Sequence, residues 1–555
     1  MAFYTIGVDF GTLSGRAVLV DTKDGREIAE AMLEYPHGVM DAVLCDTEMP
    51  LPADFALQHP LDYIEVLEAV IPAVLEKGGV KKEEVIGICV DFTSCTVLPI
   101  KKDLSPLCLD PVYKNNPHAY VKLWKHHAAQ PYADRINELA TARGEKWLSR
   151  FGGKVSSEWL FPKIWETLDC APEVYENADA FIEAGDFVTA LLTGEITRGY
   201  AFAAYKGEYG LEDGGFPTED FLGSLDARLR TVVEDKLYGR IVFGGERVGV
   251  VSEAAARRFG LARGTAVACP LPDAHISAAA MRQTRAGDML AILGTSACYM
   301  VIDEKDAGVP GICGAVKNGL APDFYGYESG LCCLGDLYTW ACENVVSPEY
   351  VKEAQERGIP MIRLLIEKAA RQRPGEHGLL ALNWWNGNRN ILIDAELSGL
   401  LVGMNLRTRP EDILRALIEA TAFGTRVIIE NYEKNGIAVR RFVAGGGIAR
   451  KDPFTMQLFA DVLKIDIEVA ESRQIPALSG AIYAAVAAGQ TRGGYASYSE
   501  ACERMGSPIH TVYHPNPDAS RVYDRLYTEY RRLHDYFGRG GSSVMKTLRS
   551  IRKDG

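Results

Sequence analysis

The chain has 555 residues, of which 47% are hydrophobic and 24% charged, a composition that supports two or more packed domains and excludes a disordered chain. Its 60 Lys and Arg against 74 Asp and Glu give a formal charge of −14, and only a short C-terminal stretch from Lys546 to Lys553 is basic. Nucleic acid is therefore not the expected partner.

The cysteines and the hydropathy pattern narrow the class further. Twelve cysteines are scattered without a Cys-x-x-Cys spacing, which argues against a disulfide scaffold and against a zinc site. The N-terminus enters a strand pattern directly, and no run approaches about eighteen consecutive apolar residues, so neither a signal peptide nor a membrane span is expected. These features predict a soluble, cytoplasmic protein with no membrane partner.

The first predicted element is a hairpin at residues 5–21, in which two apolar runs flank a polar tip. Glycines let the backbone turn and expose its N–H groups, and hydroxyls add donors, as a phosphate requires. The tip residues with this chemistry are Gly11, Thr12, Ser14, Gly15 and Arg16, the last adding a fixed positive charge. Asp9 supplies a hard oxygen of the kind that Mg²⁺ prefers. An ordinary glycine-rich turn explains the same residues equally well.

A helix and a buried strand come next in the chain. Apolar periodicity predicts a helix over 61–77, which Pro72 should kink or divide. The apolar run 85–92 predicts a buried strand with a small polar cluster at its carboxyl end. Because loops at such strand ends bind ligands in α/β proteins, Cys95 and Thr96 are candidate substrate contacts. A simple strand-ending turn is the alternative.

Two further polar residues of the first half stand in apolar surroundings. Lys206 follows the apolar segment 201–205, and a lysine there needs a partner or a ligand if it is buried. The strand 266–269 leads into Asp273, at the start of a small-residue helix. A helix cap is the plain role of an aspartate in that position.

A second hairpin lies at residues 288–303, with an apolar strand, a Gly-Thr-Ser turn that begins at Gly294 and Thr295, and a second strand. This turn follows the first by about half of the chain length, so the sequence indicates two related halves, 1–283 and 284–555. Two such tips facing each other across a cleft could hold a nucleoside triphosphate.

The second half contains a glycine-bracketed carboxylate and two helices. Glu328 lies between Gly326 and Gly330. A capping box that begins at Thr408 predicts the start of a helix that runs from Glu411 to about Tyr432. The small residues of 479–485 predict a helix that allows close packing behind it.

A short predicted strand at 441–444 runs into Gly445, Gly446 and Gly447. A dinucleotide fingerprint is a weak interpretation, because Arg450 stands where its third glycine belongs. Three glycines between a strand and a helix do let a flat base or a ribose pack against the backbone.

Together these segments resemble the FGGY family of carbohydrate kinases. The motifs that carry the resemblance are Asp9-Phe10-Gly11-Thr12, Pro272-Asp273-Ala274-His275, Gly294-Thr295-Ser296, Gly445-Gly446-Gly447 and Ser479-Gly480-Ala481. The longer blocks 123–129, 155–163, 204–206, 326–330 and 382–389 resemble the family members that act on ribulose. The resemblance covers nearly the whole chain.

The resemblance implies an α/β fold of two duplicated ribonuclease-H-like domains, as in actin-like ATPases, with a central cleft. It implies ATP-dependent phosphorylation of L-ribulose at O5, in arabinose catabolism, with ATP and Mg²⁺. By family motif, Asp273 is the general base, Thr12 and Thr295 face the phosphates, and Asp9 organises Mg²⁺. Gly446 lies under the adenosine. Lys206, Glu328 and the loop at Cys95 and Thr96 face the sugar.

One departure and two alternatives accompany this assignment. The loop after residue 92 lacks the Arg-Glu pair of glycerol kinases, which argues against glycerol as the substrate. The first alternative is another pentulose or polyol kinase, since the preference for the D or L sugar depends on pocket geometry. The second is a nucleotide-switched ATPase on the same fold without a sugar substrate. The oligomeric state is left open, with a homodimer as one option.

Overall fold

The computed structural model describes residues 3–45 and 47–554. The chain groups into two compact units. Unit 1 contains the chain up to Thr284 together with Ala315–Gly326 and Gln474–Ser507, and unit 2 contains Arg285–Gly314, Tyr327–Arg473 and the chain from Pro508 onward. Two segments of the C-terminal half thus belong to the unit that holds the N-terminal half, and the domain boundary after residue 283 stays a prediction.

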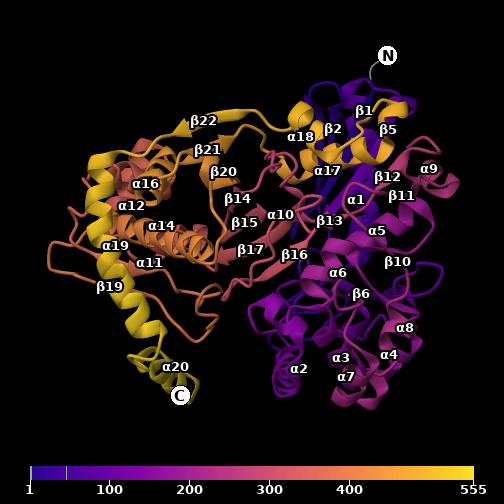
Figure 1. The fold of residues 1–555 in the computed structure, drawn as a ribbon, viewed down its shortest axis with the longest axis horizontal. Helices are drawn as coiled ribbons and strands as arrows, with labels where there is room; N and C mark the ends of the chain where they lie inside the picture. The colour runs from indigo at the N-terminus through magenta and orange to yellow at the C-terminus, as the bar shows by residue number, and fades with distance from the viewer. Residues whose placement is uncertain (1–2, 46, 555) are drawn as a thin grey trace. The chain divides into compact units, whose positions relative to one another are not determined.

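Unit 1 is built on a mixed sheet (Figure 1). Its strands lie in the order β11 (Arg247–Val250), β12 (Ala266–Ala268), β5 (Val85–Phe92), β1 (Tyr4–Phe10), β2 (Ser14–Asp21) and β3 (Glu27–Glu34). β1 pairs antiparallel with β2 and parallel with β5. The short β13 (Leu271–Pro272) also pairs parallel with β5. The predicted first hairpin therefore forms the middle of this sheet.

Unit 2 is built on a second mixed sheet. Its strands lie in the order β17 (Tyr325–Leu331), β15 (Ala297–Asp303), β14 (Asp288–Leu293), β20 (Arg441–Gly445), β21 (Ile467–Ala470) and β22 (Ile509–Tyr513). β14 pairs antiparallel with β15 and parallel with β20, as β1 does with β2 and β5.

The two sheets share one order of six strands and differ in connectivity at one edge, where β11 precedes β12 in the chain but β22 follows β21. The order β3-β2-β1-β5-β12-β11 in unit 1 corresponds to β17-β15-β14-β20-β21-β22 in unit 2. The edge strand β11 pairs antiparallel with β12 in unit 1, and the edge strand β22 pairs antiparallel with β21 in unit 2. The prediction of two related α/β halves, each opening on one hairpin, is confirmed.

Helices cover both faces of the unit 1 sheet. α1 (Pro60–Gly78) packs against β2 and β3, while α17 (Ile475–Ala488) packs against β1, β5 and β12. Pro72 lies inside α1, which continues through it to Gly78, so the expectation that this proline divides the helix is wrong. The left-handed Gly79 ends α1 and donates its N–H to Glu76 O.

The contact of α17 with the sheet is unusually close because glycines face each other. A Cβ atom added to Gly7 on β1 would lie 1.7 Å from Ala477 O, and one added to Gly87 on β5 would lie 2.5 Å from Ala484 O. On the helix side, a Cβ atom on Gly480 would lie 3.2 Å from Gly7 Cα. The predicted close packing behind the small-residue helix is confirmed.

Unit 1 also contains a smaller, four-stranded sheet and a second hydrophobic core rich in aromatic rings. The sheet contains β4 (Leu57–Gln58), β7 (Val121–Lys122), β6 (Val97–Ile100) and β8 (Ala180–Glu183). Nearby helices are α2 (Gln130–Arg143), α3 (Leu160–Cys170), α4 (Pro172–Asn177), α7 (Glu219–Leu225) and α8 (Val232–Lys236). Buried rings of this core include Trp147, Trp159, Phe161 and Trp165. Unit 1 also holds α5 (Ala184–Thr193), α6 (Tyr200–Lys206), α9 (Glu253–Phe259), α10 (Asp273–Ile276), β9 (Thr197–Gly199) and β10 (Arg240–Val242).

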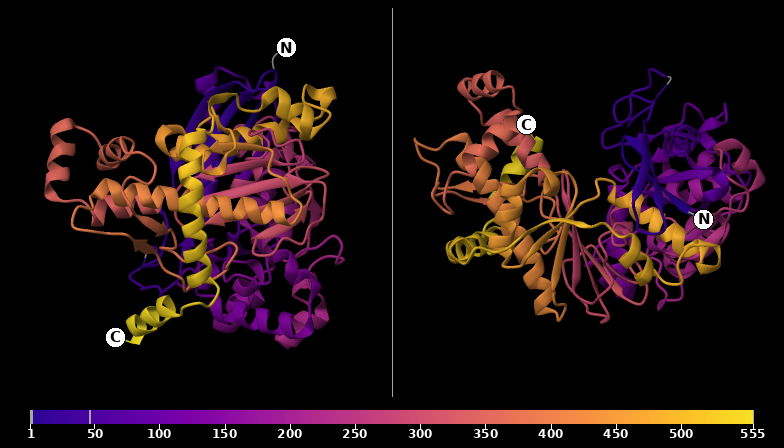
Figure 2. Two further views of the ribbon diagram at one scale, coloured as in Figure 1. Left: turned by 60° about the vertical axis from the view of Figure 1, so that its left-hand side comes forward. Right: turned by 90° about the horizontal axis from the view of Figure 1, so that it is seen from above.

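Unit 2 carries the longest helices of the described chain. They are α14 (Pro410–Lys434) and α19 (Pro517–Gly538), the latter followed by α20 (Val544–Asp554) at the yellow end of the ribbon (Figure 2). Arg409 is the N-cap of α14 and Asp412 closes its capping box, so the predicted cap at Thr408 is wrong by one residue. Other elements are α11 (Gly335–Asn344), α12 (Pro348–Arg357), α13 (Met361–Ala369), α15 (Gly447–Lys451), α16 (Pro453–Leu463), β18 (Leu380–Leu382) and β19 (Leu400–Val402), while β16 (Gly314–Lys317) and α18 (Tyr498–Met505) belong wholly or mainly to unit 1.

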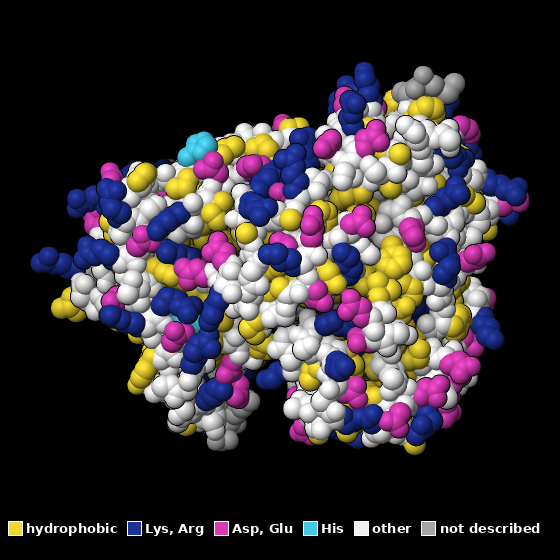
Figure 3. Space-filling view, in the orientation of Figure 1, with side chains coloured by type: hydrophobic (Ala, Val, Ile, Leu, Met, Phe, Trp, Pro, Cys, Tyr) yellow, Lys and Arg dark blue, Asp and Glu magenta, His cyan; other side chains and the backbone are white. Residues whose placement is uncertain are grey.

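The surface mixes charges of both signs. On the face seen in Figure 3, acidic and basic side chains are interspersed and neither forms a large patch of one sign. Every helix in the part of the chain that the structure describes is too short or too polar to span a bilayer.

The glycine contact between β1 and α17 predicts a strong stability effect. We expect Gly7→Ala to lower the free energy of unfolding by at least about 2 kcal/mol, because the new methyl group overlaps helix backbone that cannot move aside. Gly308→Ala is the matched control, since nothing lies within 4 Å of its added Cβ atom. Thermal unfolding of both variants checks this, and equal melting temperatures would contradict the overlap.

Candidate functional site

The tip of the β1–β2 hairpin is tied back by side chains from outside it. Gly11 N–H donates to Ser14 O at 3.0 Å and closes the turn. The Tyr35 hydroxyl donates to Gly11 O at 2.9 Å, and Gln58 Nε2 donates to Thr12 O at 2.7 Å. These bonds occupy the tip's carbonyl oxygens, which a phosphate would repel.

Arg16 and Ser14 interact with each other at the base of the tip. The Arg16 guanidinium lies 3.2 Å from Asp9 Oδ2 and donates to Ser14 Oγ at 3.2 Å. Ser14 is buried, whereas Gly11 and Thr12 are partly exposed. Trp124 Nε1 donates to Thr12 Oγ1 at 3.1 Å, a contact that the sequence did not indicate.

Three carboxylates gather at the carboxyl ends of β1, β5 and β13. The strand registers place Asp91 beside Asp9 and beside Leu271, two residues before Asp273. Asp9 and Asp91 are buried, and Asp273 is partly exposed. Burial, followed by the charges of Asp9 and Asp273, raises the pKa of Asp91 well above its usual range. Burial also raises the pKa of Asp9, which the Arg16 charge opposes.

This carboxylate cluster fits a hard divalent cation. Both oxygens of Asp91 are buried, and their hydrogen-bonding contact is with the carboxyl of Asp9. Carboxylate oxygens are the ligands that Mg²⁺ prefers, usually one or two of them together with water and substrate phosphates. Asp9 and Asp91 together supply such a pair. Asp91 was missed because it stands within an otherwise apolar strand pattern, where one polar residue is an easily overlooked signal.

Asp273 opens α10, which has only four residues. The N-cap of this helix is Pro272, so Asp273 occupies the first helical position. Its Oδ1 accepts the N–H of Ala274 at 2.7 Å, and its carbonyl accepts the hydroxyl of Ser277 at 3.0 Å. The sequence predicted a small-residue helix that starts at Asp273, and the helix that forms there ends at Ile276.

The loop after β5 is held by a buried lysine. Lys163, on α3, is 1% exposed, and its Nζ donates to Cys95 O at 2.5 Å and to Leu123 O at 2.8 Å. Cys95 adopts a φ of 60°, a left-handed conformation that costs energy outside glycine. Lys163 therefore fixes a strained turn by bonding its carbonyl.

Thr96 is held as firmly as Cys95. Its N–H donates to Glu183 Oε2 at 3.0 Å, and its hydroxyl lies 2.9 Å from that of Thr93. Thr96 is fully buried, so its hydroxyl bonds within the loop. Burial raises the pKa of Glu183 to about 7, and the Lys163 charge opposes that shift.

Lys206 ends α6 in the same region of unit 1. It is 8% exposed, and its Nζ lies 5.5 Å from the centroid of the Trp159 ring. Burial raises the pKa of the Cys95 thiol to about 12, while the positive charges of Lys163 and Lys206 oppose that rise. Unit 1 thus brings Lys206 close to the loop that holds Cys95.

The second hairpin, in unit 2, has a tip one residue shorter than the first. Gly294 N–H donates to Ser296 O, two residues on, at 3.0 Å, whereas Gly11 N–H donates to Ser14 O, three residues on. Leu334 N–H donates to Thr295 O at 2.8 Å, and Gly335 N–H donates to Gly294 O at 3.0 Å. Here backbone amides at the start of α11 hold the tip carbonyls, and the Thr295 side chain is exposed.

The three glycines of the second half lie beside this tip. The parallel register pairs Gly445 with Ile292, near the end of β14. Gly446 has a φ of 95°, and an added Cβ atom would lie 2.6 Å from Leu293 O. An added Cβ atom on Gly447 meets nothing within 4 Å. Unit 2 therefore brings all the predicted nucleotide-binding residues of the second half to the adjacent ends of β14 and β20.

Glu328 lies on β17, 8% exposed, and belongs to unit 2. The other predicted sugar residues belong to unit 1: Cys95, Thr96, Lys206 and Asp273.

The family comparison agrees with both halves. The N-terminal domain of the FGGY family of carbohydrate kinases matches residues 4–280, and its C-terminal domain matches residues 289–488. A ribulokinase of Halalkalibacterium halodurans is 48% identical over 549 residues, which cover 99% of this chain and 97% of that protein. A ribulokinase of Mycolicibacterium smegmatis is 43% identical over 552 residues, with 99% and 97% covered.

Solved structures agree in fold. A xylulose kinase from Rhodospirillum rubrum has a TM-score of 0.76 at 22% identity, covering 96% of this chain and 98% of that one. Plasmodium falciparum glycerol kinase with ADP has a TM-score of 0.73 at 15% identity, with 96% and 98% covered. From the family matches along both halves and from the duplicated sheets, the chain belongs to the FGGY family of carbohydrate kinases.

Proposed function

We propose that this kinase transfers the γ-phosphoryl group of ATP to O5 of L-ribulose, giving L-ribulose 5-phosphate and ADP in arabinose catabolism. The observation that carries the proposal is the 48% identity to proteins named ribulokinase over almost the full length of both chains. The two solved sugar kinases named above are 22% and 15% identical to this chain, so they support the fold alone.

Asp273 is the general base in this proposal. Its carboxylate accepts the O5 proton while the phosphoryl group moves from ATP to O5, and ADP leaves. Its place at the strand ends, close enough to Asp91 to raise that residue's pKa, supports the role. Because the transition state of phosphoryl transfer is loose, positioning the hydroxyl accounts for part of the effect.

The phosphates are assigned to the two hairpin tips, at Thr12 and Thr295, with Gly446 beneath the adenosine. Asp9 holds Mg²⁺, and we add Asp91 as a second candidate ligand because its buried carboxyl lies beside that of Asp9. When bound, Mg²⁺ neutralises charge on the β- and γ-phosphates. Arg16 holds the Asp9 carboxylate in place through their 3.2 Å contact.

The sugar is assigned to Lys206, Glu328 and the loop at Cys95 and Thr96. The buried, engaged hydroxyl of Thr96 favours a contact through the loop backbone over one through its side chain. Lys163 acts on this loop from behind and positions it.

A substrate panel tests the proposed function. Purified protein is assayed with ATP and Mg²⁺ against D- and L-ribulose, D-xylulose, ribitol and glycerol, with ADP release as the readout. We expect the kcat/KM for L-ribulose to exceed the others by roughly 10-fold or more. A higher value for another pentulose or polyol would replace the substrate, and ADP release that no acceptor stimulates would favour the nucleotide-switched ATPase.

Asp273→Asn separates the base from a structural role. Asparagine keeps the shape and accepts the Ala274 N–H, so the melting temperature should stay near that of the parent. Turnover should fall by about 10²-fold or more, with ATP affinity largely kept. Wild-type turnover in the folded variant would remove Asp273 from the catalytic role.

Lys163→Met tests the positioning of the sugar loop. Loss of the bonds to Cys95 O and Leu123 O should raise the KM for the sugar by roughly 10-fold or more and leave the KM for ATP near its original value. Lys122→Met is the comparison variant, because this buried lysine bonds Glu166, Thr167 and the Lys163 carbonyl but neither Cys95 O nor Leu123 O. Equal changes in sugar KM for both variants would reduce Lys163 to a general stability role.

A further inference from the structure

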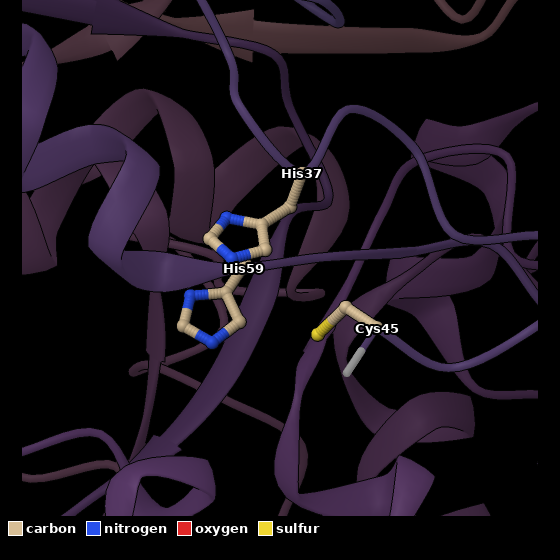
Figure 4. A group of neighbouring side chains, drawn as sticks. All are labelled: His37, Cys45 and His59. Carbon is tan, nitrogen blue, oxygen red and sulfur yellow. The ribbon is translucent and has the colours of Figure 1, made fainter. Parts of the chain in front are cut away.

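A second cluster of metal-ligand side chains in unit 1 is made of residues other than the three carboxylates. His37, Cys45 and His59 each offer one ligand atom, and these atoms all lie within 4.8 Å of one another. Figure 4 shows the two imidazole rings one above the other with the Cys45 sulfur directed toward them. The rings are stacked, with centroids 4.2 Å apart and planes 18° from parallel.

The cluster has a carboxylate behind it. His37 Nδ1 of the ring lies 2.5 Å from Asp62 Oδ1. The backbone N–H of His37 donates to Asp62 Oδ2 at 3.3 Å. Asp62 is fully buried on α1. A carboxylate bonded to one ring nitrogen fixes the ring and makes the other nitrogen a better metal ligand.

We propose that His37, Cys45 and His59 form a binding site for a borderline-soft divalent cation of the Zn²⁺ class. Two imidazoles and a thiolate are a ligand set that Zn²⁺ accepts, with the fourth position open to water. On binding, the Cys45 thiol loses its proton to solvent as the metal–sulfur bond forms. Hard Mg²⁺ prefers oxygen ligands and does not compete for this set.

Binding has a structural cost that ties it to α1. Ligands at zinc–nitrogen and zinc–sulfur bond lengths lie about 3.3–3.8 Å apart, so the ligand atoms must draw together. The stacked rings must also turn, because a metal ion lies in the plane of each imidazole that binds it. His59 is the N-cap of α1, and its Nδ1 accepts the Leu61 N–H at 3.3 Å. A neutral imidazole that binds metal through its other nitrogen carries its proton on Nδ1, which ends this cap bond.

Both histidines adjoin residues that support the first hairpin tip. His37 follows two residues after Tyr35, whose hydroxyl bonds Gly11 O at 2.9 Å. His59 follows directly after Gln58, whose Nε2 bonds Thr12 O at 2.7 Å. Contraction of the cluster therefore pulls on both supports, and metal occupancy alters kinase turnover. This second step rests on the proposed function, whereas metal binding does not.

Cobalt titration tests the site without sugar or nucleotide. Reduced, metal-free full-length protein is titrated with Co²⁺, and we expect a thiolate-to-cobalt charge-transfer band that saturates at about one equivalent and that Zn²⁺ displaces. Cys45→Ser should abolish the band, and His37→Gln should weaken Co²⁺ binding. Asp62→Asn should weaken it by about 10- to 100-fold. Cys170→Ser, an exposed cysteine outside the cluster, should keep the band.

The outcomes divide the two steps. A band that persists in Cys45→Ser, or no saturable binding in the parent, overturns the site. For the coupling, sugar-dependent ADP release is measured with Mg²⁺ and ATP, with and without one equivalent of Zn²⁺. We expect a change in turnover for the parent and none for Cys45→Ser. Equal responses overturn the coupling and leave the site standing, and absence of any sugar-dependent release counts against the proposed function alone.

Discussion

Repulsion among three clustered carboxylates, two of them buried, is the constraint around which unit 1 is arranged. Asp9, Asp91 and Asp273 meet at the ends of three adjacent strands, and the Arg16 charge is the opposing cation that acts on the first two. Such a cluster disfavours the folded chain until a cation or a proton neutralises it. In the proposed function, a divalent ion brought in with the nucleotide relieves the repulsion, so the same arrangement that costs stability favours the ligand.

In the proposed function the hairpin tips meet a related requirement, because a turn that receives phosphate must present its N–H groups and keep its carbonyl oxygens away from the phosphate. Unit 1 hides them with the side chains of Tyr35 and Gln58, whereas unit 2 uses the backbone amides of Leu334 and Gly335. The side-chain solution is open to adjustment by whatever displaces those two residues. The backbone solution is fixed by the start of a helix. The two duplicated halves thus bond the carbonyl oxygens of their hairpin tips in two different ways.

Much of this architecture was predictable from the sequence, since hairpins, glycine turns and the small-residue helix depend on local pattern. Asp91 was not recognised as a site residue from the sequence, because one polar residue inside an apolar strand changes the hydrophobic periodicity very little. The role of Lys163 was not predicted, because it bonds backbone carbonyls that are distant in sequence and that any residue type could supply. His37, Cys45 and His59 follow no ligand spacing, and only the fold brings them together. The α14 cap was misplaced because Thr408 and Arg409 are adjacent and both precede a suitable acid.

The glycine-lined contact of α17 with β1 also sets an order of events during synthesis. β1 leaves the ribosome long before the helix that covers its face, because that helix spans Ile475–Ala488. Until most of the chain has been made, that face of the first sheet has no native cover. Contacts so distant in sequence form slowly, and an exposed sheet face invites aggregation. Newly made chains of this kinase therefore depend on protection during translation for longer than the early position of their first hairpin would suggest.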